Sequence, residues 1–184
     1  MDIQKKMIIE TENLRLIVCD TEILKEAISG NENLSKKLGV TVLDNWTEFG
    51  VGALEFSLKK LSENENESGW WTCFPIHKKN NRLIGSGGYQ GKPTIEGTVE
   101  IGYEITSDYR SCGFATEMAM GLVENAFKYD RVNSIIAHTL GKENSSTKVL
   151  TKCGFDKIEE INDPDEGIIW KWELKRKTRT ANKV

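Results

Sequence analysis

The chain has 184 residues, of which 38% are hydrophobic and 29% charged, and its mean hydropathy is −0.45. This length and composition predict a single globular domain, which we place at residues 1–174, and exclude wholesale disorder. No apolar run approaches the roughly 20 residues that span a bilayer, and the N-terminus lacks the apolar stretch of a signal peptide. We therefore expect a cytoplasmic protein with no membrane partner.

The charge is unevenly distributed along the chain. The formal net charge is −3, but residues 175–184 carry five cations and no acid. The other 20 cations and 28 acids give residues 1–174 a net charge of −8. An acidic body argues against DNA as a partner and favours a cationic substrate, and we expect the basic end to be a disordered tail. The sequence leaves open whether the chain forms a homo-oligomer.

Cysteine usage predicts free thiols and no metal site. The four cysteines are widely spaced, with no CxxC pair and no neighbouring histidine cluster. Most are expected to be buried as small hydrophobes. Cys112 is the exception, because it lies in the stretch YRSCGFATEM, residues 109–118.

The N-terminal part of the chain predicts one strand and two helical regions. Residues 12–19 alternate and are rich in branched side chains, which is typical of a strand. A helix is expected to begin at Thr21, as its cap, and to stop at Gly30. Residues 31–61 form a second, less regular helical region, and the polar residues 57–69 indicate a loop.

The rest of the chain alternates more regularly. Residues 70–91 predict two strands joined by a turn, and residues 98–106 predict the clearest strand of the chain. There follow a one-sided helix at 115–127, a strand at 134–140, a helix at 145–154 closed by Gly154, and strands at 155–161 and 168–174. About seven strands and four helices in this order predict an α/β (α+β) fold with a mixed sheet.

Two glycine-containing stretches are candidate phosphate sites. GSGGYQG, residues 85–91, fails as a dinucleotide fingerprint because Gln90 stands where the third glycine belongs, and no P-loop motif exists. YRSCGFATEM lies between a strong strand and a strong helix, so its backbone N–H groups are unpaired donors at a helix N-terminus that can bind an anion. Gly113 would admit a diphosphate closely, Ala115 keeps the next turn small and Arg110 adds a cation. A merely tight turn is the alternative.

Together, VEIGYEI, YRSCGFATEM and AHTLGKENSSTKVLTKCGF resemble the GNAT superfamily of N-acetyltransferases, in particular its RimJ/RimL-like branch, over residues 9–174. The resemblance implies a mostly antiparallel sheet, splayed at two central parallel strands to admit acetyl-coenzyme A (acetyl-CoA). It implies that the pantetheine amides pair with the strand edge at Ile105 and Thr106, and that Asn144 bonds the pantetheine arm or only caps its helix. The implied pyrophosphate loop consists of Arg110, Ser111, Cys112, Gly113, Phe114 and Ala115.

Acetyl transfer to an amine needs a neutral nucleophile, a donor to the carbonyl oxygen and a proton for the leaving thiolate. Glu100 and Glu104 are candidate bases on one strand face, with Cα atoms about 13 Å apart. Glu100 is favoured because family members often carry an acid at that position, and solvated carboxylates on an exposed strand face are the alternative. The carbonyl donor is expected to be a backbone N–H near Ile105.

Many family members carry a tyrosine in the last helix as the acid for the thiolate, and Leu150 stands at that position here. Ser146, one helical turn earlier, is the substitute that the sequence offers, and a helix-start serine without catalytic duty is the alternative. His138 is expected to be a packed or edge residue, and His77 a surface residue. Trp46 and Phe49 are candidates for lining an acceptor cleft.

The sequence thus predicts an N-acetyltransferase in which a primary amine attacks acetyl-CoA directly. The RimJ/RimL resemblance favours the N-terminal α-amine of a protein, such as a ribosomal protein, as the acceptor. A small amine, such as a polyamine or an aminoglycoside antibiotic, is the alternative. The missing tyrosine also leaves open a non-catalytic acyl-CoA sensor, and the glycine loop leaves open a nucleotide-binding module.

Overall fold

The computed structural model describes residues 7–177, and residues 1–6 and 178–184 lie outside the described part. The described strands form one sheet in the order β1-β2-β3-β5-β6-β7-β9-β8, and β4 pairs with β3 beside this row. The strands are β1 Ile8–Glu10, β2 Leu14–Val18, β3 Thr72–His77, β4 Arg82–Leu83, β5 Gly85–Tyr89, β6 Thr98–Ile105, β7 Ser134–Leu140, β8 Asp156–Asp163 and β9 Gly167–Lys175. Neighbours pair antiparallel except β6 and β7, which run parallel. This confirms the predicted mixed α/β fold.

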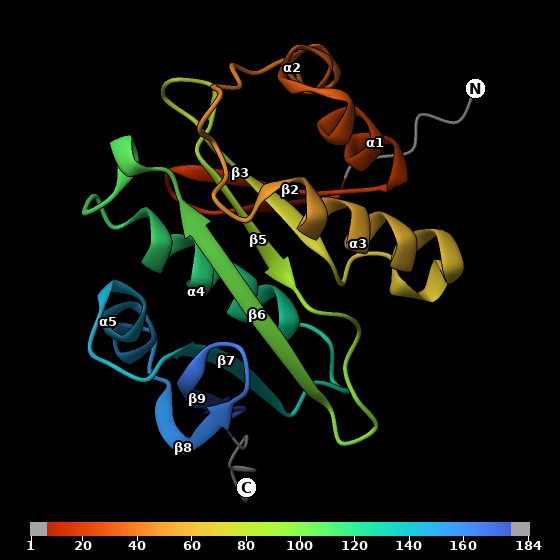
Figure 1. Cartoon of the computed structure of the whole chain (residues 1–184). Coiled ribbons are helices and arrows are strands. Elements are labelled where there is room, and N and C mark those ends of the chain that lie inside the picture. Colours follow the sequence, from red (N-terminus) through yellow and green to blue (C-terminus); the bar gives the residue numbers. More distant parts are fainter. Residues whose placement is uncertain (1–6, 178–184) are drawn as a thin grey trace, which may run out of the picture.

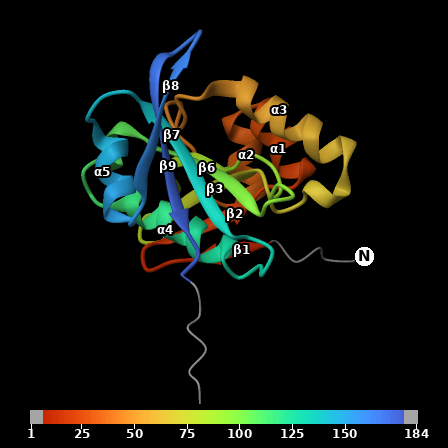
Figure 2. The same cartoon turned by 90° about the horizontal axis from the view of Figure 1, so that it is seen from below.

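In the described part of the chain, five α-helices cover both faces of the sheet (Figure 1). They are α1 Thr21–Ser29, α2 Asn31–Leu38, α3 Gly50–Glu63, α4 Phe114–Ala126 and α5 Ser145–Lys152, with short 3-10 helices η1 Glu65–Glu67 and η2 Ser107–Tyr109. α1, α2 and α3 gather on one face, and α4 lies behind β6 in the view of Figure 1. α5 packs beside α4, and β8 and β9 form the hairpin at one end of the sheet (Figure 2). None of these helices is long and apolar enough to cross a membrane.

Each face of the sheet has its own apolar core, because successive strand residues point to opposite faces. On β2, Leu16 is buried in the cluster that contains Met118 of α4. Ile17, its neighbour, is buried instead in the cluster that contains Phe74 and the apolar residues of α1, α2 and α3. The two cores hold the middle of the sheet between helices, which fixes the position of β6.

The structure contains more elements than the sequence predicted. β1 is a short edge strand and β4 a two-residue strand that pairs with β3 just before β5, which raises the number of strands from about seven to nine. The helical region 31–61 divides into α2 and α3, because Gly39 adopts a left-handed φ of 71° and ends α2. α3 then runs on into the stretch expected to be a loop, since Leu54, Ser57 and Leu61 bury one helical face.

Two local assignments also differ from the sequence expectation. Asp20 rather than Thr21 caps α1, because its side-chain oxygen accepts a hydrogen bond from Ile23 N–H at 2.8 Å. At the other end, Lys175 belongs to β9, and the guanidinium of Arg176 donates to three backbone carbonyl oxygens. The rest of the expected tail, residues 178–184, lies outside the described part.

The parallel strands β6 and β7 pair only over their first residues. The paired residues run from Thr98 to Glu100 on β6 and from Ser134 to Ile136 on β7. Beyond them β6 continues beside β5, and β7 continues beside β9. The two strands therefore separate after Glu100, as the resemblance implied, and one backbone edge of β6 is left open.

Candidate active site

A cavity of about 850 Å³, which we call the splay cavity, opens where β6 and β7 separate. Its walls come from the end of β6, the loop that follows, and the first turns of α4 and α5. The predicted cofactor residues that line it are Ile105, Arg110, Ser111, Gly113, Phe114 and Ala115. Glu104 and Ser146 line it too, whereas Glu100, Thr106, Cys112 and Asn144 are outside its lining.

The first turn of α4 presents unpaired backbone donors to the splay cavity. Gly113 caps this helix, and no side chain in the described residues bonds to the cap. Ser111 and Gly113 have φ values of 61° and 88°, which shape the turn in the left-handed region. A Cβ on Gly113 would meet no heavy atom within 4 Å, so the space in front of the turn is open. Unpaired N–H groups and the positive helix end make this turn an anion site.

The guanidinium of Arg110 lies at the rim of the splay cavity and is already paired. Its Nε donates to the Ile105 carbonyl oxygen at 2.9 Å. Its terminal nitrogen pairs with Glu48, in the segment before α3, and the two side chains are 50% and 67% exposed. An ion pair that exposed contributes little free energy, so Arg110 can exchange this partner for an anion in the cavity.

An aromatic cluster supports the loop that carries the anion site. The ring of His77, at the end of β3, contacts Tyr109 and Phe114 at centroid distances of 5.3 and 4.9 Å. His77 is only 9% exposed, so its prediction as a surface residue is wrong. The two lysines after His77 indicated an exposed position, but the loop after β6 packs over its ring. Cys112, by contrast, is exposed, with Sγ 3.4 Å from the Arg110 carbonyl oxygen.

The backbone groups of β6 alternate between its two edges. The Glu100 carbonyl oxygen and the Thr106 N–H bond to residues at the ends of β5, at 3.0 and 2.8 Å. By alternation, Tyr103 and Ile105 turn their N–H and C=O groups to the open edge that faces the splay cavity. Of the two residues predicted at this edge, Ile105 is therefore on it, and Thr106 is tied into the sheet.

Tyr103 and Ser146 meet at the splay cavity. The Tyr103 hydroxyl donates to the backbone carbonyl oxygen of Ser146 at 3.4 Å. Burial, with a smaller contribution from Cys153, raises the pKa of Tyr103, so its hydroxyl stays protonated at neutral pH. Leu150, at the position of the family tyrosine, is fully buried and has no polar group. A strand residue thus supplies the phenol that the helix lacks.

Asn144 caps α5 through a reciprocal pair of bonds. Its side-chain oxygen accepts from the Thr147 N–H at 3.0 Å, and the Thr147 hydroxyl oxygen accepts from the Asn144 N–H at 3.0 Å. The side-chain amide nitrogen of Asn144 has no hydrogen-bond partner within residues 7–177. That nitrogen remains a donor for a ligand, so capping and ligand binding are compatible.

Glu104, one of the two predicted bases, holds the segment before α3. Its carboxylate accepts hydrogen bonds from the Thr47 hydroxyl and from the backbone N–H groups of Glu48 and Phe49. Both of its oxygens are used in these contacts. Glu104 therefore anchors the segment before α3 and leaves no carboxylate oxygen without a partner.

Glu100, the other predicted base, lies at the last residue pair of β6 and β7. Its Oε1 lies 2.8 Å from Nδ1 of His138 on β7 and 3.2 Å from Nε2 of Gln90. The two side chains of the Glu100–His138 pair are 25% and 28% exposed. Its second oxygen, Oε2, has no partner among residues 7–177 and is free to accept a proton.

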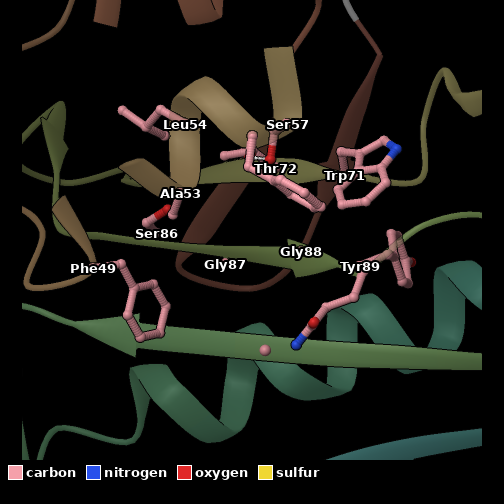
Figure 3. A pocket seen from close by; sticks show the side chains of 13 residues that line it. Phe49, Ala53, Leu54, Ser57, Trp71, Thr72, Ser86, Gly87, Gly88 and Tyr89 are labelled. Atoms are coloured by element: carbon pink, nitrogen blue, oxygen red, sulfur yellow. Dashed lines mark hydrogen bonds between the residues drawn. The ribbon is translucent and has the colours of Figure 1, made fainter. Parts of the chain in front are cut away.

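A smaller cavity of about 290 Å³ lies between α3 and the strands β3, β5 and β6 (Figure 3). We call it the α3 pocket. Phe49 lines both cavities, so they adjoin. Gln90 and Gly102 also line the α3 pocket. Gln90 donates a hydrogen bond to Glu100, and Gly102 is the next residue on the same face of β6 as Glu100. Trp46, a candidate for this cleft, is instead 4% exposed and packs against Phe74.

Residues 26–156 match the family description "Acetyltransferase (GNAT) domain". The chain belongs to this family. As a GNAT acetyltransferase it is an acetyl-CoA-dependent N-acetyltransferase, which confirms the predicted enzyme class. The residues of the splay cavity fit acetyl-CoA. The backbone N–H groups at the start of α4, which no side chain caps, can bind a diphosphate, and the open edge of β6 can bond to amides. Within residues 7–177, no group of three His, Cys, Asp or Glu side chains is placed to hold a metal ion.

This GNAT acetyltransferase is similar to an uncharacterized N-acetyltransferase, YjdG, of Bacillus subtilis (strain 168), with 27% identity over 150 residues that cover 81% of this chain and 89% of the relative. Among solved structures it is similar to the RimL ribosomal L7/L12 α-N-protein acetyltransferase in complex with coenzyme A, at a TM-score of 0.67 and 15% identity over 92% of this chain and 98% of that one. A spermidine N-acetyltransferase chimera from Vibrio cholerae SpeG and hSSAT has a TM-score of 0.64 and 12% identity over 89% and 96% of the two chains. At these identities the two structures establish the fold.

Two residues of this GNAT site were not singled out from the sequence. Tyr103 faces a cavity because β6 has lost its β7 neighbour there. His138 was expected to be a packed or edge residue, and its contact with Glu100 crosses between two strands that are far apart in the sequence. The sequence signal that could have found this contact was the GNAT resemblance, because it implies that these two strands run parallel side by side.

Proposed function

We propose that this protein transfers the acetyl group of acetyl-CoA to the α-amine at the N-terminus of a polypeptide. The observation that supports a polypeptide acceptor is the apolar rim of the α3 pocket. Phe49 and Phe56 line the pocket and are 55% and 53% exposed, and Val51 beside them is 48% exposed. Exposed apolar side chains around a pocket are typical of a protein-binding surface. The RimL enzyme, similar in fold, acts on a protein N-terminus.

The donor is expected to occupy the splay cavity. The N–H groups of the Ser111–Ala115 turn would hold the pyrophosphate, and Arg110 would exchange Glu48 for a phosphate oxygen. The open edge at Ile105 and the free amide of Asn144 would hold the pantetheine arm. Cys112 lies at the pyrophosphate end, so it plays no part in a direct attack by the amine.

Glu100 is the proposed general base, acting directly or through a water molecule. His138 and Gln90 hold its Oε1, and its free Oε2 can take the proton of the attacking amine. An α-amine with a pKa of about 7.8 is a little more than a quarter neutral near pH 7.4, whereas a lysine amine with a pKa of about 10.4 is neutral in about one molecule in a thousand. A single carboxylate base is therefore better suited to deprotonating an α-amine than a lysine side chain.

The proton for the leaving thiolate is proposed to come from a hydroxyl that lines the splay cavity. Tyr103 and Ser146 both line the cavity there. Although burial raises the pKa of Tyr103, its phenol is still a stronger acid than an aliphatic hydroxyl, and the Ser146 carbonyl oxygen orients it. We assign the proton to Tyr103, with the Ser146 hydroxyl as the second candidate.

Paired carboxamide variants test the proposed base. Glu100→Gln keeps the shape of the side chain but removes the proton acceptor, and we expect kcat for an N-terminal peptide to fall by about 100-fold. Glu104→Gln is the control, because Glu104 lies on the same strand face with both oxygens occupied, and its effect on kcat should be under about tenfold. Rates are followed by thiol release from acetyl-CoA. Equal losses in the two variants would contradict the assignment of Glu100.

A further inference from the structure

The α3 pocket differs from the splay cavity in the chemistry of its lining. Its thirteen lining residues include no carboxylate, ammonium, guanidinium or imidazole group. Aromatic and aliphatic side chains form most of the wall, with three glycines of β5 and β6 in its floor. The exposed members of this lining are Phe49, Ala53, Phe56 and Gln90.

Apart from the Ser86 hydroxyl and the Gln90 carbonyl oxygen, the side-chain polar groups of this pocket already have partners in the protein. The Thr72 hydroxyl donates to the Ser57 hydroxyl at 2.9 Å, and both side chains are buried (Figure 3). The Trp71 indole N–H donates to Glu67 at 3.0 Å, and the Tyr89 hydroxyl is bonded to a carbonyl of α4 at 2.7 Å. A second charged group of an acceptor would therefore lose its water without gaining a partner of opposite charge, which is costly.

The size of the pocket argues for a large side chain. At roughly 30 Å³ for each water molecule, 290 Å³ corresponds to about ten waters, which is ample room for the side chain of Leu, Met or Phe. A glycine, alanine or serine side chain would leave most of the aromatic wall without a contact. The edge-on contact of Phe56 with Trp71, at a centroid distance of 5.6 Å, gives the wall a fixed shape.

The pocket is also placed correctly for the chemistry. Gln90 lines it and donates to Glu100, and Gly102 continues the strand face on which Glu100 lies. An α-amine is one carbon away from its own side chain. A side chain seated between α3 and β6 would then leave the amine of the same residue near Gln90, which connects the pocket to Glu100.

We infer that the acceptor is a polypeptide whose first residue carries a large, uncharged, apolar side chain, such as Leu, Met or Phe, bound in the α3 pocket. This inference rests on the proposed transfer to an α-amine. Burial of one such side chain changes binding by about 10- to 100-fold. The same pocket rejects polycationic acceptors, whose further ammonium groups find no carboxylate in it.

A peptide series that differs only in the first residue tests this. Acetyl-CoA turnover is measured with peptides that begin with Leu, Met, Phe, Ala, Asp or Lys, and with spermidine. We expect kcat/KM to be at least tenfold higher for Leu, Met and Phe than for Asp and Lys, with Ala between them. Equal values across the series would leave α-amine transfer standing and overturn the inference. If spermidine is acetylated and none of the peptides is, or if no acceptor is acetylated, both the transfer to an α-amine and the inference about the first residue are overturned.

A charge placed in the pocket provides the second test. Ala53 is exposed on α3 and lines the pocket, so Ala53→Asp adds a carboxylate to the wall, and Ala53→Asn is its uncharged control of the same size. We expect Ala53→Asp to lower the ratio of kcat/KM for the Leu and Lys peptides by at least tenfold, and Ala53→Asn to leave Leu preferred. Thermal unfolding and acetyl-CoA affinity confirm that both variants are folded. An unchanged ratio in Ala53→Asp would place the side chain elsewhere.

Discussion

Replacing Gly113 with aspartate is expected to abolish most of the affinity for acetyl-CoA. A Cβ at this position would enter open space, so the new carboxylate points into the splay cavity where the diphosphate is proposed to bind. A charge of −1 about 6 Å from a diphosphate of charge about −2 costs about 1.4 kcal/mol in a water-like dielectric, and more where the cavity excludes water. The dissociation constant should therefore rise at least tenfold.

Gly113→Asn is the matched control for this prediction. Both variants place an L-residue at a φ of 88°, so both carry the same backbone strain of about 1–2 kcal/mol. Asparagine has the shape of aspartate without its charge, and its coenzyme A affinity should stay within a few-fold of the wild type. Isothermal titration calorimetry with coenzyme A measures all three proteins. If Gly113→Asp binds as tightly as Gly113→Asn, the loop is only a turn and the pyrophosphate binds elsewhere.

Two further predictions concern Tyr103 and Glu117. Tyr103→Phe should lower kcat by about tenfold and leave coenzyme A affinity unchanged, whereas Ser146→Ala should change kcat less; the reverse order in steady-state kinetics would assign the acid to Ser146. Glu117, on α4, accepts hydrogen bonds from Thr11 at 2.6 Å and from backbone N–H groups of the β1–β2 turn, so Glu117→Ala should cost about 2 kcal/mol in urea denaturation. Burial raises the pKa of Glu117, but these hydrogen bonds outweigh it, and the net pKa lies below the ordinary value of 4.5. A lowered folded-state pKa stabilises the fold above that ordinary value, and the stabilisation is lost as pH falls through the folded-state pKa. The gap between wild type and Glu117→Ala should therefore close in acid, and parallel curves down to about pH 3 would contradict the role of this carboxylate.

The features that could be predicted from the sequence are those with a local signal. The turn from Arg110 to Ala115 lies between an alternating strand and a one-sided helix, and its glycine stands where the structure has a left-handed cap. The capping role of Asn144 is set by Thr147, three residues on. The succession of strands and helices along the chain could be predicted because the periodicity that marks each element is a local property of the sequence.

The features that could not be predicted depend on contacts between distant segments. Glu100 and Glu104 are alike in the sequence, and only the segment before α3 distinguishes them by occupying both oxygens of Glu104. His138 reaches Glu100 from another strand. His77 is buried because the loop carrying Phe114 folds over it. In each case the residue type permitted either role, and the tertiary packing decided it.

Mass spectrometry of a reacted peptide tests the central claim most directly. The protein is incubated with acetyl-CoA and a peptide that begins with Leu and carries one internal Lys, and the product is fragmented to locate the acetyl group. The account predicts one acetyl group on the α-amine, none on the lysine, and no reaction when the α-amine is blocked beforehand. Acetylation of the lysine alone, or an unmodified peptide while spermidine is acetylated, would contradict it.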